Sequence, residues 1–412
     1  MAKDDSRSPG GPRLRVFSEV RIHRGPDGSF RLRDQADASV WRLYADGPGL
    51  VGGVSLAARV GPLNPSATMP VADVAVHELP WFEGTWGLVR QLGAVLIALA
   101  VAVRTPRLCL FRLPGSLSLL GAVTARLARR PYVVEVVGDP VAVLRSGVAG
   151  RLGRALTPLC RRLMRWSTAG ALAARYETDS TLQRLYPPAA GAWSVNYSTV
   201  DLAPEDIAPG PRQQGPTVTT LIAVGMQDQL YKGHDDLITA ASLLRDQGRP
   251  IEVVIVGHGR HHNALRQMAV DLGVADAVHF AGRVNDRTAL REFFGRADLF
   301  CMPSRTEGLP RALIEAMAQG LPAVGTAVGG IPELLGPDVL VPPDDPHALA
   351  AMIARLSDNP TARAEAAHQN HQRALCFTRG AQEEARTSWR RQVLALSAPD
   401  PLGIAAPHVE EP

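Results

Sequence analysis

The second half of the chain alternates short apolar runs, rich in β-branched residues, with stretches of helical periodicity. This alternation is typical of a parallel sheet whose two faces are covered by crossover helices. The pattern therefore predicts a doubly wound α/β sheet, in which ligands bind outside the carboxyl ends of the strands. The predicted strands are 217–225, 251–257, 277–282, 297–303, 322–326 and 338–342, and the predicted helices lie near 234–247, 259–273, 286–297, 310–319, 345–357 and 361–376.

The first half shows the same order of elements in a weaker form. Together the halves predict two Rossmann-like domains that face each other across a cleft, and a length of 412 residues suits two or three domains. The predicted strands here are 14–20, 54–60, 107–113, 132–138 and 169–175, with helices at 86–104, 117–130, 148–167 and 178–186. We expect a disordered lead over 1–13, an N-terminal acceptor-binding domain over 14–200, a linker over 201–216, a C-terminal domain over 217–378, a final helix over 379–397 that packs back on the N-terminal domain, and a disordered tail over 398–412.

Composition argues against several other classes of protein. The formal net charge of +4 is too small to indicate nucleic-acid binding by itself. The longest apolar run, Leu92–Val103, is shorter than the roughly 20 residues that a membrane-spanning helix needs, and we expect a buried helix there. Residues 1–13 contain no apolar signal-peptide core. The cysteines are scattered without metal-ligand spacing, which favours free thiols in a reducing cytoplasm.

The segment Ser304–Glu315, with the sequence SRTEGLPRALIE, places a glycine turn and a predicted helix start directly after a buried strand. Helix N-termini favour phosphate, because their first N–H groups are unpaired and the helix dipole is positive there. Glu307 and Glu315 repel phosphate but accept hydrogen bonds from sugar hydroxyls. The segment therefore suits a ligand that is part phosphate and part polyol, which is the composition of a nucleotide sugar.

Three further strand ends carry residues suited to the same ligand. Lys232 stands just before a predicted helix, where its ammonium group can reach a diphosphate, and Gly233 allows close backbone approach. Taken alone, such a lysine is more often a solvated surface residue, and each glutamate a surface or capping carboxylate. Because the strand ends meet at one edge of the sheet, we expect these groups to lie together. The other strand ends contribute Gly225, Gly257, Gly259 and the run FAGRV at 280–284.

Together these motifs resemble those of glycosyltransferase family 4, whose members are retaining enzymes of the GT-B fold. The first half of the chain resembles the family only in its order of strands and helices. In the second half the resemblance covers about 217–342 and rests on Gly225, Lys232-Gly233, VIVGHG at 254–259, FAGRV at 280–284, the block 304–324 and GGIPELL at 329–335.

The resemblance implies a role for each matching residue. Glu307 would contact hydroxyls of the donor sugar, Glu315 the ribose, and Lys232 the diphosphate of the leaving nucleotide. The donor would be a nucleotide sugar, UDP by default, with no cofactor. No D-x-D pair occurs to indicate a metal. The implied catalytic residues are Glu307, Lys232 and Asp139, and the implied donor contacts are Gly225, Lys232, Gly233, Gly257, Gly259, Arg283 and Val284 for the base, Gly308, Leu309, Arg311 and Glu315.

The family's reaction retains the anomeric configuration by attack from the face of the leaving group. Two glutamates therefore do not imply the two-carboxylate mechanism of a glycosidase. One departure concerns the diphosphate, beside which relatives often carry an arginine. This chain has Met226 at that position, and Arg260 and Arg305 are the substitutes that the sequence offers.

A second departure lies in the first domain, where relatives often carry a histidine near the donor sugar. This chain has Gly138 at that place, followed by Asp139 and Pro140. Either Asp139 or Glu135 takes the polar contact with sugar or acceptor, or Asp139 is a plain turn residue before a proline.

Acceptor specificity is expected in the first domain, which carries a basic cluster. Arginines beside an apolar helical stripe are typical of a helix on a membrane surface, and the alternative is a core-facing helix with a solvated arginine face. The first interpretation predicts a cytoplasmic enzyme, peripheral at the inner face of the cell membrane, with a lipid-linked, amphiphilic glycan or natural-product acceptor. The cluster is Arg126, Arg129, Arg130, Arg145, Arg151, Arg154, Arg161, Arg162 and Arg165, and the stripe is Leu152, Leu156, Leu159, Leu163 and Trp166.

Two alternatives to an active transferase remain open. A GT-B scaffold or partner subunit that binds nucleotide sugar without turnover is favoured by Met226 and Gly138. A sugar-nucleotide epimerase of the same fold is disfavoured by the glutamate spacing and by Lys232-Gly233.

Overall fold

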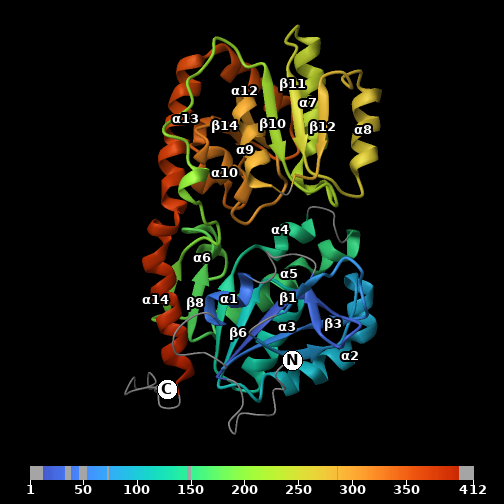
Figure 1. Cartoon of the computed structure of the whole chain (residues 1–412), viewed down its shortest axis with the longest axis vertical. Helices are drawn as coiled ribbons and strands as arrows, with labels where there is room; N and C mark the ends of the chain where they lie inside the picture. The colour runs from blue at the N-terminus through green and yellow to red at the C-terminus, as the bar shows by residue number, and fades with distance from the viewer. Residues whose placement is uncertain are drawn as a thin grey trace.

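The computed structural model describes residues 13–32, 39–45, 53–71, 74–145, 150–284 and 286–398. Two α/β domains lie one above the other, and α13 (Pro360–Ala374) and α14 (Arg379–Ser397) run along one side of both (Figure 1). Residues 1–12 and 399–412, nearly all of the predicted lead and tail, lie outside the described residues.

The N-terminal domain is built on a nine-stranded sheet. In the described residues its strands run parallel, in the order β5-β3-β1-β6-β7-β8-β9, except that β2 and β4 add antiparallel. The strands are β1 (Leu14–Arg24), β2 (Phe30–Leu32), β3 (Val54–Gly61), β4 (Met69–Pro70), β5 (Ala75–Leu79), β6 (Leu108–Leu113), β7 (Tyr132–Val136), β8 (Ala173–Tyr176) and β9 (Trp193–Asn196). The helices are α1 (Ser39–Ala45), α2 (Gly84–Ala102), α3 (Ser116–Leu127), α4 (Pro140–Arg145), α5 (Gly150–Thr168) and α6 (Thr181–Leu185).

Helices cover both faces of this sheet, and each face has its own apolar core. On one face α2, α3 and α5 form a layer, in which Leu99, Leu117 and Met164 share a core with the strands. On the other face α1 and the C-terminal helix α14 share a second core, which includes Trp41 and Trp389. The last helix of the chain therefore completes the core of the first domain.

The prediction of a buried helix at Leu92–Val103 is wrong. α2 buries only one side, and its opposite side exposes large apolar residues, among them Trp86 and Ile97 at 70% each. Apolar residues all round a helix do not specify which side packs, and the neighbouring layer covers only one stripe. Even so, none of the helices described here is long and apolar enough to cross a bilayer.

The C-terminal domain is built on a six-stranded parallel sheet in the order β12-β11-β10-β13-β14-β15. All six predicted strands form, each shorter than predicted by one to four residues. The strands are β10 (Thr220–Val224), β11 (Glu252–Val256), β12 (Val278–Gly282), β13 (Leu299–Met302), β14 (Ala323–Thr326) and β15 (Leu340–Val341). The helices are α7 (His234–Asp246), α8 (His262–Asp271), α9 (Arg287–Arg296), α10 (Arg311–Ala318), α11 (Ile331–Leu334) and α12 (Pro346–Asp358), before α13 and α14.

Candidate active site

The order of the C-terminal strands reverses between β10 and β13, and the loops that follow these strands carry the predicted residues. β10 pairs with β11 on one side and with β13 on the other. In an open α/β sheet, ligands bind at such a switch point, because the crossover helices leave toward opposite faces there. Lys232 follows β10, Gly257 follows β11, Arg283 follows β12 and Glu307 follows β13.

Lys232 and Glu307 form an ion pair at this switch point. The Lys232 Nζ atom lies 2.7 Å from Glu307 Oε1, and the Ser304 hydroxyl donates a hydrogen bond of 2.7 Å to the same oxygen. The lysine side chain is 18% exposed and the glutamate 8%, so Lys232 is not a solvated surface lysine. The residues predicted for the diphosphate and for the sugar hydroxyls are thus brought together.

Glycines let the loops around this pair approach each other closely. Gly233 has a φ of 69°, and a Cβ atom there would lie 1.9 Å from the carbonyl oxygen of Pro303. Gly257 has a φ of 140°, and its Cβ atom would lie 1.9 Å from the carbonyl oxygen of Gly225. Gly259 packs as tightly against the backbone of 227–228. Three glycines predicted to contact the donor therefore also set the distance between the strand ends. A side chain at any of them would increase that distance.

The turn at 307–309 faces the N-terminal domain. A Cβ atom on Gly308 would lie 2.7 Å from the carbonyl oxygen of Val137, so the turn packs directly against the chain that leaves β7. The Gly330 N–H donates a hydrogen bond of 2.7 Å to the Gly308 carbonyl, and Leu309 packs against the core of its own domain. The loop that carries Glu307 is therefore held between the two domains.

Helix α10 begins at Arg311, directly after this turn. The first N–H groups of an α-helix have no partner within the helix, so its start can accept an anion. Glu315 lies one turn along α10, where burial raises the pKa of its carboxyl above the ordinary value against the opposing effect of Arg311. A partly desolvated carboxyl at this place is suited to hydrogen bonds from hydroxyls.

Arg283 and Val284 follow β12 at the same edge. A hydrogen bond of 2.8 Å from the Gly257 N–H to the Gly282 carbonyl joins the ends of β11 and β12. Val284 packs against the domain core, whereas Arg283 is exposed. Of the two residues predicted for the base, only Arg283 presents its side chain to solvent.

Met226 leaves the loop after β10 without the family's arginine, and the two proposed substitutes differ in their contacts. Arg305 is bound by three carboxylates. Arg260 is exposed, and its Nε donates a hydrogen bond of 2.5 Å to the carbonyl oxygen of Asp228, in the same loop as Met226. Arg260 thus lies beside this loop, while Arg305 is already neutralised. The carboxylate partners of Arg305 are Asp235, Asp236 and Asp344.

In the N-terminal domain, Asp139 has the contacts of a turn residue. Its Oδ1 accepts a hydrogen bond of 2.9 Å from the Val141 N–H, and the Tyr186 hydroxyl donates to the same oxygen. A contact from Asp139 to sugar stays a prediction. Glu135 is buried and accepts a hydrogen bond from Tyr44, so it belongs to the core rather than to the switch point.

Two polar residues at the switch point escaped the sequence analysis. His234 is buried at the start of α7, and burial, then the charge of Lys232, lower its pKa to about 4. Its Nε2 atom lies beside Gly225, 3.4 Å from where a Cβ atom would be. Gln227 is fully buried, and its side-chain amide donates to the Gly257 carbonyl. The run Lys232-Gly233-His234 was the available signal, because an uncharged histidine at a helix start is a potential donor to phosphate.

Comparisons with known proteins agree with the fold. Residues 216–373 match the family model "Glycosyl transferases group 1". The chain is 28% identical to Protein CapJ of Staphylococcus aureus over 262 residues, which cover 63% of this chain and 64% of that protein. It thus spans less than two thirds of the length of the first curated relatives that it matches.

Among solved structures, sucrose-phosphate synthase from Thermosynechococcus elongatus matches with a TM-score of 0.66 and 17% identity, over 93% of this chain and 99% of that one. HepE from Anabaena in complex with UDP matches with a TM-score of 0.59 and 18% identity, over 91% and 99%. These likenesses confirm the predicted GT-B fold.

Proposed function

We propose that this chain is a retaining glycosyltransferase that moves a hexosyl-type sugar from a nucleotide donor, a UDP-sugar, to a hydroxyl of a lipid-linked or other amphiphilic acceptor. The observation that carries the proposal is the ion pair between Lys232 and Glu307 at the switch point. It lies within the residues that match the glycosyltransferase family model.

In this proposal the two members of the ion pair contact different parts of the donor when it binds. Breaking the glycosidic bond leaves negative charge on the diphosphate, which Lys232 and the start of α10 are placed to stabilise. Glu307 accepts hydrogen bonds from sugar hydroxyls, and Glu315 does so from the ribose. The acceptor attacks from the face of the leaving diphosphate, whose oxygen takes the acceptor's proton, so no protein carboxylate has to act as base.

UDP is proposed as the nucleotide, and the HepE complex with UDP supports it by analogy of fold. We further propose that catalysis needs no metal, as the lack of a D-x-D pair suggests. Lys232 and the α10 N-terminus would then carry the leaving-group charge, with Arg260 as a further cation beside the loop of Met226.

The amphiphilic acceptor is proposed because one surface of the N-terminal domain is apolar and basic. The exposed side of α2 belongs to the same layer as α3 and α5, whose exposed residues include Leu127, Leu156 and Leu159. No Asp or Glu occurs between Glu83 and Glu135, nor in α5. An apolar surface with basic residues and no acidic ones is suited to an anionic lipid surface. The enzyme would work in the cytoplasm, peripheral at the inner face of the membrane.

The test is nucleotide release from a panel of nucleotide sugars with lipid and sugar acceptors. We expect release with one donor, and at least a tenfold loss of turnover in Lys232→Ala and in Glu307→Ala. Circular dichroism of both variants should match the wild type. Near-normal turnover in both would refute the site assignment.

The same assay separates the proposal from a scaffold that binds donor without turnover. Donor binding by calorimetry without any release, across the whole acceptor panel, would favour the scaffold. Interconversion of the donor sugar without acceptor would favour an epimerase.

A further inference from the structure

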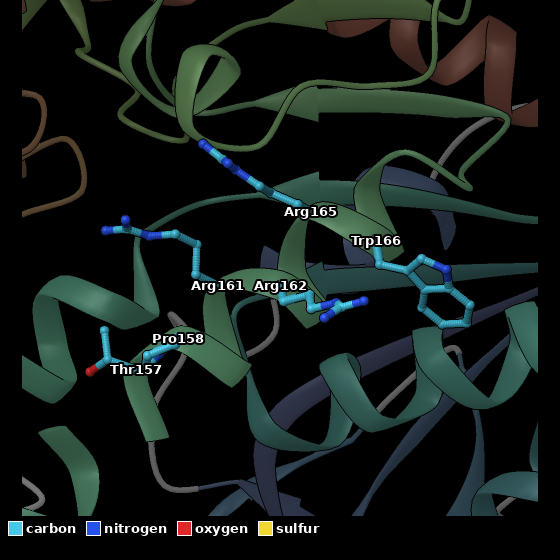
Figure 2. Close-up of a pocket in the computed structure, with 6 residues that line it drawn as sticks. All are labelled: Thr157, Pro158, Arg161, Arg162, Arg165 and Trp166. Carbon is cyan, nitrogen blue, oxygen red and sulfur yellow. The ribbon is translucent and has the colours of Figure 1, made fainter. Parts of the chain in front are cut away.

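The C-terminal half of α5 lines a groove on the N-terminal domain. Its volume is about 540 Å³. Figure 2 shows its side chains, with Arg161 and Arg165 extending to the same side of the helix, as residues four apart do. The lining residues are Thr157, Pro158, Arg161, Arg162, Arg165 and Trp166.

The three arginines of this groove have no carboxylate partner among the described residues. Arg165 donates a hydrogen bond of 2.8 Å from Nε to the Leu185 carbonyl, which is neutral. α5 contains no Asp or Glu. By contrast, Arg305 in the other domain is surrounded by three carboxylates. Arg161 and Arg165 extend to one side and Arg162 extends toward Trp166 (Figure 2), and like charges on neighbouring residues repel one another, so the groove has an uncompensated positive charge.

The groove lies next to the predicted active site. Burial raises the pKa of the Tyr186 hydroxyl above its ordinary value, Asp139 raises it further, and the charge of Arg161 opposes the rise. The Tyr186 hydroxyl donates a hydrogen bond to Asp139, so these three residues are neighbours. Asp139 follows Val137 closely along the chain, and the Val137 carbonyl packs against Gly308 in the turn that carries Glu307. A ligand in the groove therefore reaches toward the donor side of the molecule along the end of β7.

Guanidinium groups bind phosphate well, as they bind carboxylate, because their planar fork donates two parallel hydrogen bonds to two oxygens. Trp166 adds an apolar ring at the side of the groove, and Arg126 already stacks on that ring at 4.3 Å. The combination of charge and apolar surface suits a phosphate ester that also carries an organic group.

We propose that the groove of Arg161, Arg162 and Arg165 binds the phosphate or diphosphate group of the acceptor. This inference rests on the proposed transferase function and names the chemical class of its acceptor as a phosphate ester. The phosphate has two sources, a prenyl-type lipid diphosphate or a free sugar phosphate, and the two have the same recognition chemistry in the groove.

The test is calorimetric titration of the full chain with two probes, geranyl diphosphate and glucose 6-phosphate, each in saturating UDP so that phosphate cannot bind at Lys232. Geraniol and glucose are the uncharged controls. We expect at least one phosphate probe to bind and its uncharged control not to bind. The probe that binds more tightly identifies the source of the phosphate.

The variant Arg161→Gln/Arg165→Gln should weaken that binding at least tenfold and leave UDP affinity within twofold of the wild type. The matched control, Arg90→Gln/Arg104→Gln, removes the same charge from α2 and the loop that follows it, and should change neither. No binding of either probe, equal weakening in both double variants, or equal affinity for inorganic pyrophosphate would overturn the inference. Failure of the proposed function is separate, because it would appear as a lack of UDP binding.

Discussion

Lys232 illustrates how much a single residue type can indicate. The chain contains only two lysines, Lys3 and Lys232, and all its other cationic side chains, apart from histidine, are arginines. Arginine and lysine are not interchangeable at a phosphate, because the ammonium is a compact point charge on a flexible stem. The pairing of Lys232 with Glu307 was predictable, since the strand ends that carry them meet at one edge of a doubly wound sheet.

Arg260 and Arg305 should respond differently to removal. Arg260→Ala should weaken UDP-sugar binding about tenfold with little change in melting temperature, because its side chain holds only the loop that also contains Met226. Arg305→Ala should lower the free energy of unfolding by about 2 kcal/mol, since three neighbouring carboxylates would lose their cation. Calorimetric titration and chemical denaturation measure the two effects. If Arg305→Ala weakened binding without destabilising the fold, the assignment would be reversed.

His234 should make stability depend on pH in mild acid. Its folded pKa of about 4 lies below the value of 6.5 for an exposed histidine, so the unfolded chain binds the additional proton between these two values. Stability is therefore full above about pH 6.5 and falls as the pH drops toward 4, by about 3 kcal/mol in all. In denaturation series at several pH values, His234→Gln should flatten this slope. An unchanged slope in the variant would assign it to other groups.

The run Lys232-Gly233-His234 was a signal for His234 only in hindsight, and Gln227 had none, because the importance of both residues depends on burial. Nothing in the local sequence states that His234 is enclosed between Gly225 and the body of its domain. Asp139 shows that the local sequence can indicate some contacts of a residue and miss others. Its position before Pro140 left a turn residue open as the alternative to a catalytic contact. The bond from Val141 is that of a turn residue, whereas the bond from Tyr186 joins residues 47 apart and has no local signal.

At the scale of elements, the C-terminal sheet was predictable because its strands are short, apolar and separated by helices with clear periodicity. The N-terminal half was predicted less completely. β5 carries a histidine and a glutamate within five residues, and β9 lies outside the strands predicted for the first half. Both strands are held by parallel pairing with a neighbouring strand. The β-propensity of the local sequence gives no signal of such pairing.

The exposed side of α2 leads to a prediction about membranes. Trp86→Ser/Ile97→Asp should lower co-flotation with anionic liposomes at least tenfold at low salt, because the two side chains together lose roughly 3 kcal/mol or more of apolar burial in the lipid interface. UDP binding should be unchanged.

Val270→Asp is the control, because Val270 is an exposed apolar residue on α8 of the other domain. Wild-type protein that does not float, or that loses flotation equally in the control, would argue against a lipid contact at α2. Light scattering of the same samples tests the alternative that a second copy of the chain covers this surface.

At the scale of the whole molecule, Glu333 joins the two domains beside the candidate site. Its carboxylate accepts hydrogen bonds of 2.6 Å, 3.0 Å and 2.6 Å from the N–H groups of Asp179, Ser180 and Thr181, at the start of α6. Tyr186, which holds Asp139, follows α6 directly. Glu333 also lies in the same short segment as Gly330, which binds the turn of Glu307. One carboxylate therefore links the N-terminal domain near Asp139 to the C-terminal domain near Glu307.

This contact should be sensitive to acid. Burial by itself raises the pKa of Glu333, but the hydrogen bonds from Thr181, Asp179 and Ser180 outweigh it and hold the pKa below the ordinary value of 4.5. A carboxyl with a lowered pKa stabilises the folded arrangement above its ordinary value and loses this effect as the pH falls through its folded value. Protection of the amides of Asp179 to Thr181 against hydrogen exchange, relative to the intrinsic rate at each pH, should therefore be high at neutral pH and fall below about pH 4.5.

Glu333→Gln should remove both the slow exchange and its dependence on pH, because a neutral amide accepts these bonds more weakly. We expect the contact to be weakened by about 2 kcal/mol, reduced from the value for a fully buried charge because the side chain is partly solvated. Glu365→Gln removes the same charge from an exposed site on α13 and should leave exchange at Asp179 to Thr181 unchanged. If donor turnover fell in Glu333→Gln while UDP affinity held, the contact would act by placing the N-terminal domain against the donor. If exchange did not respond to Glu333→Gln, other interdomain contacts, such as the ion pair of Arg373 with Asp179, would hold the domains together.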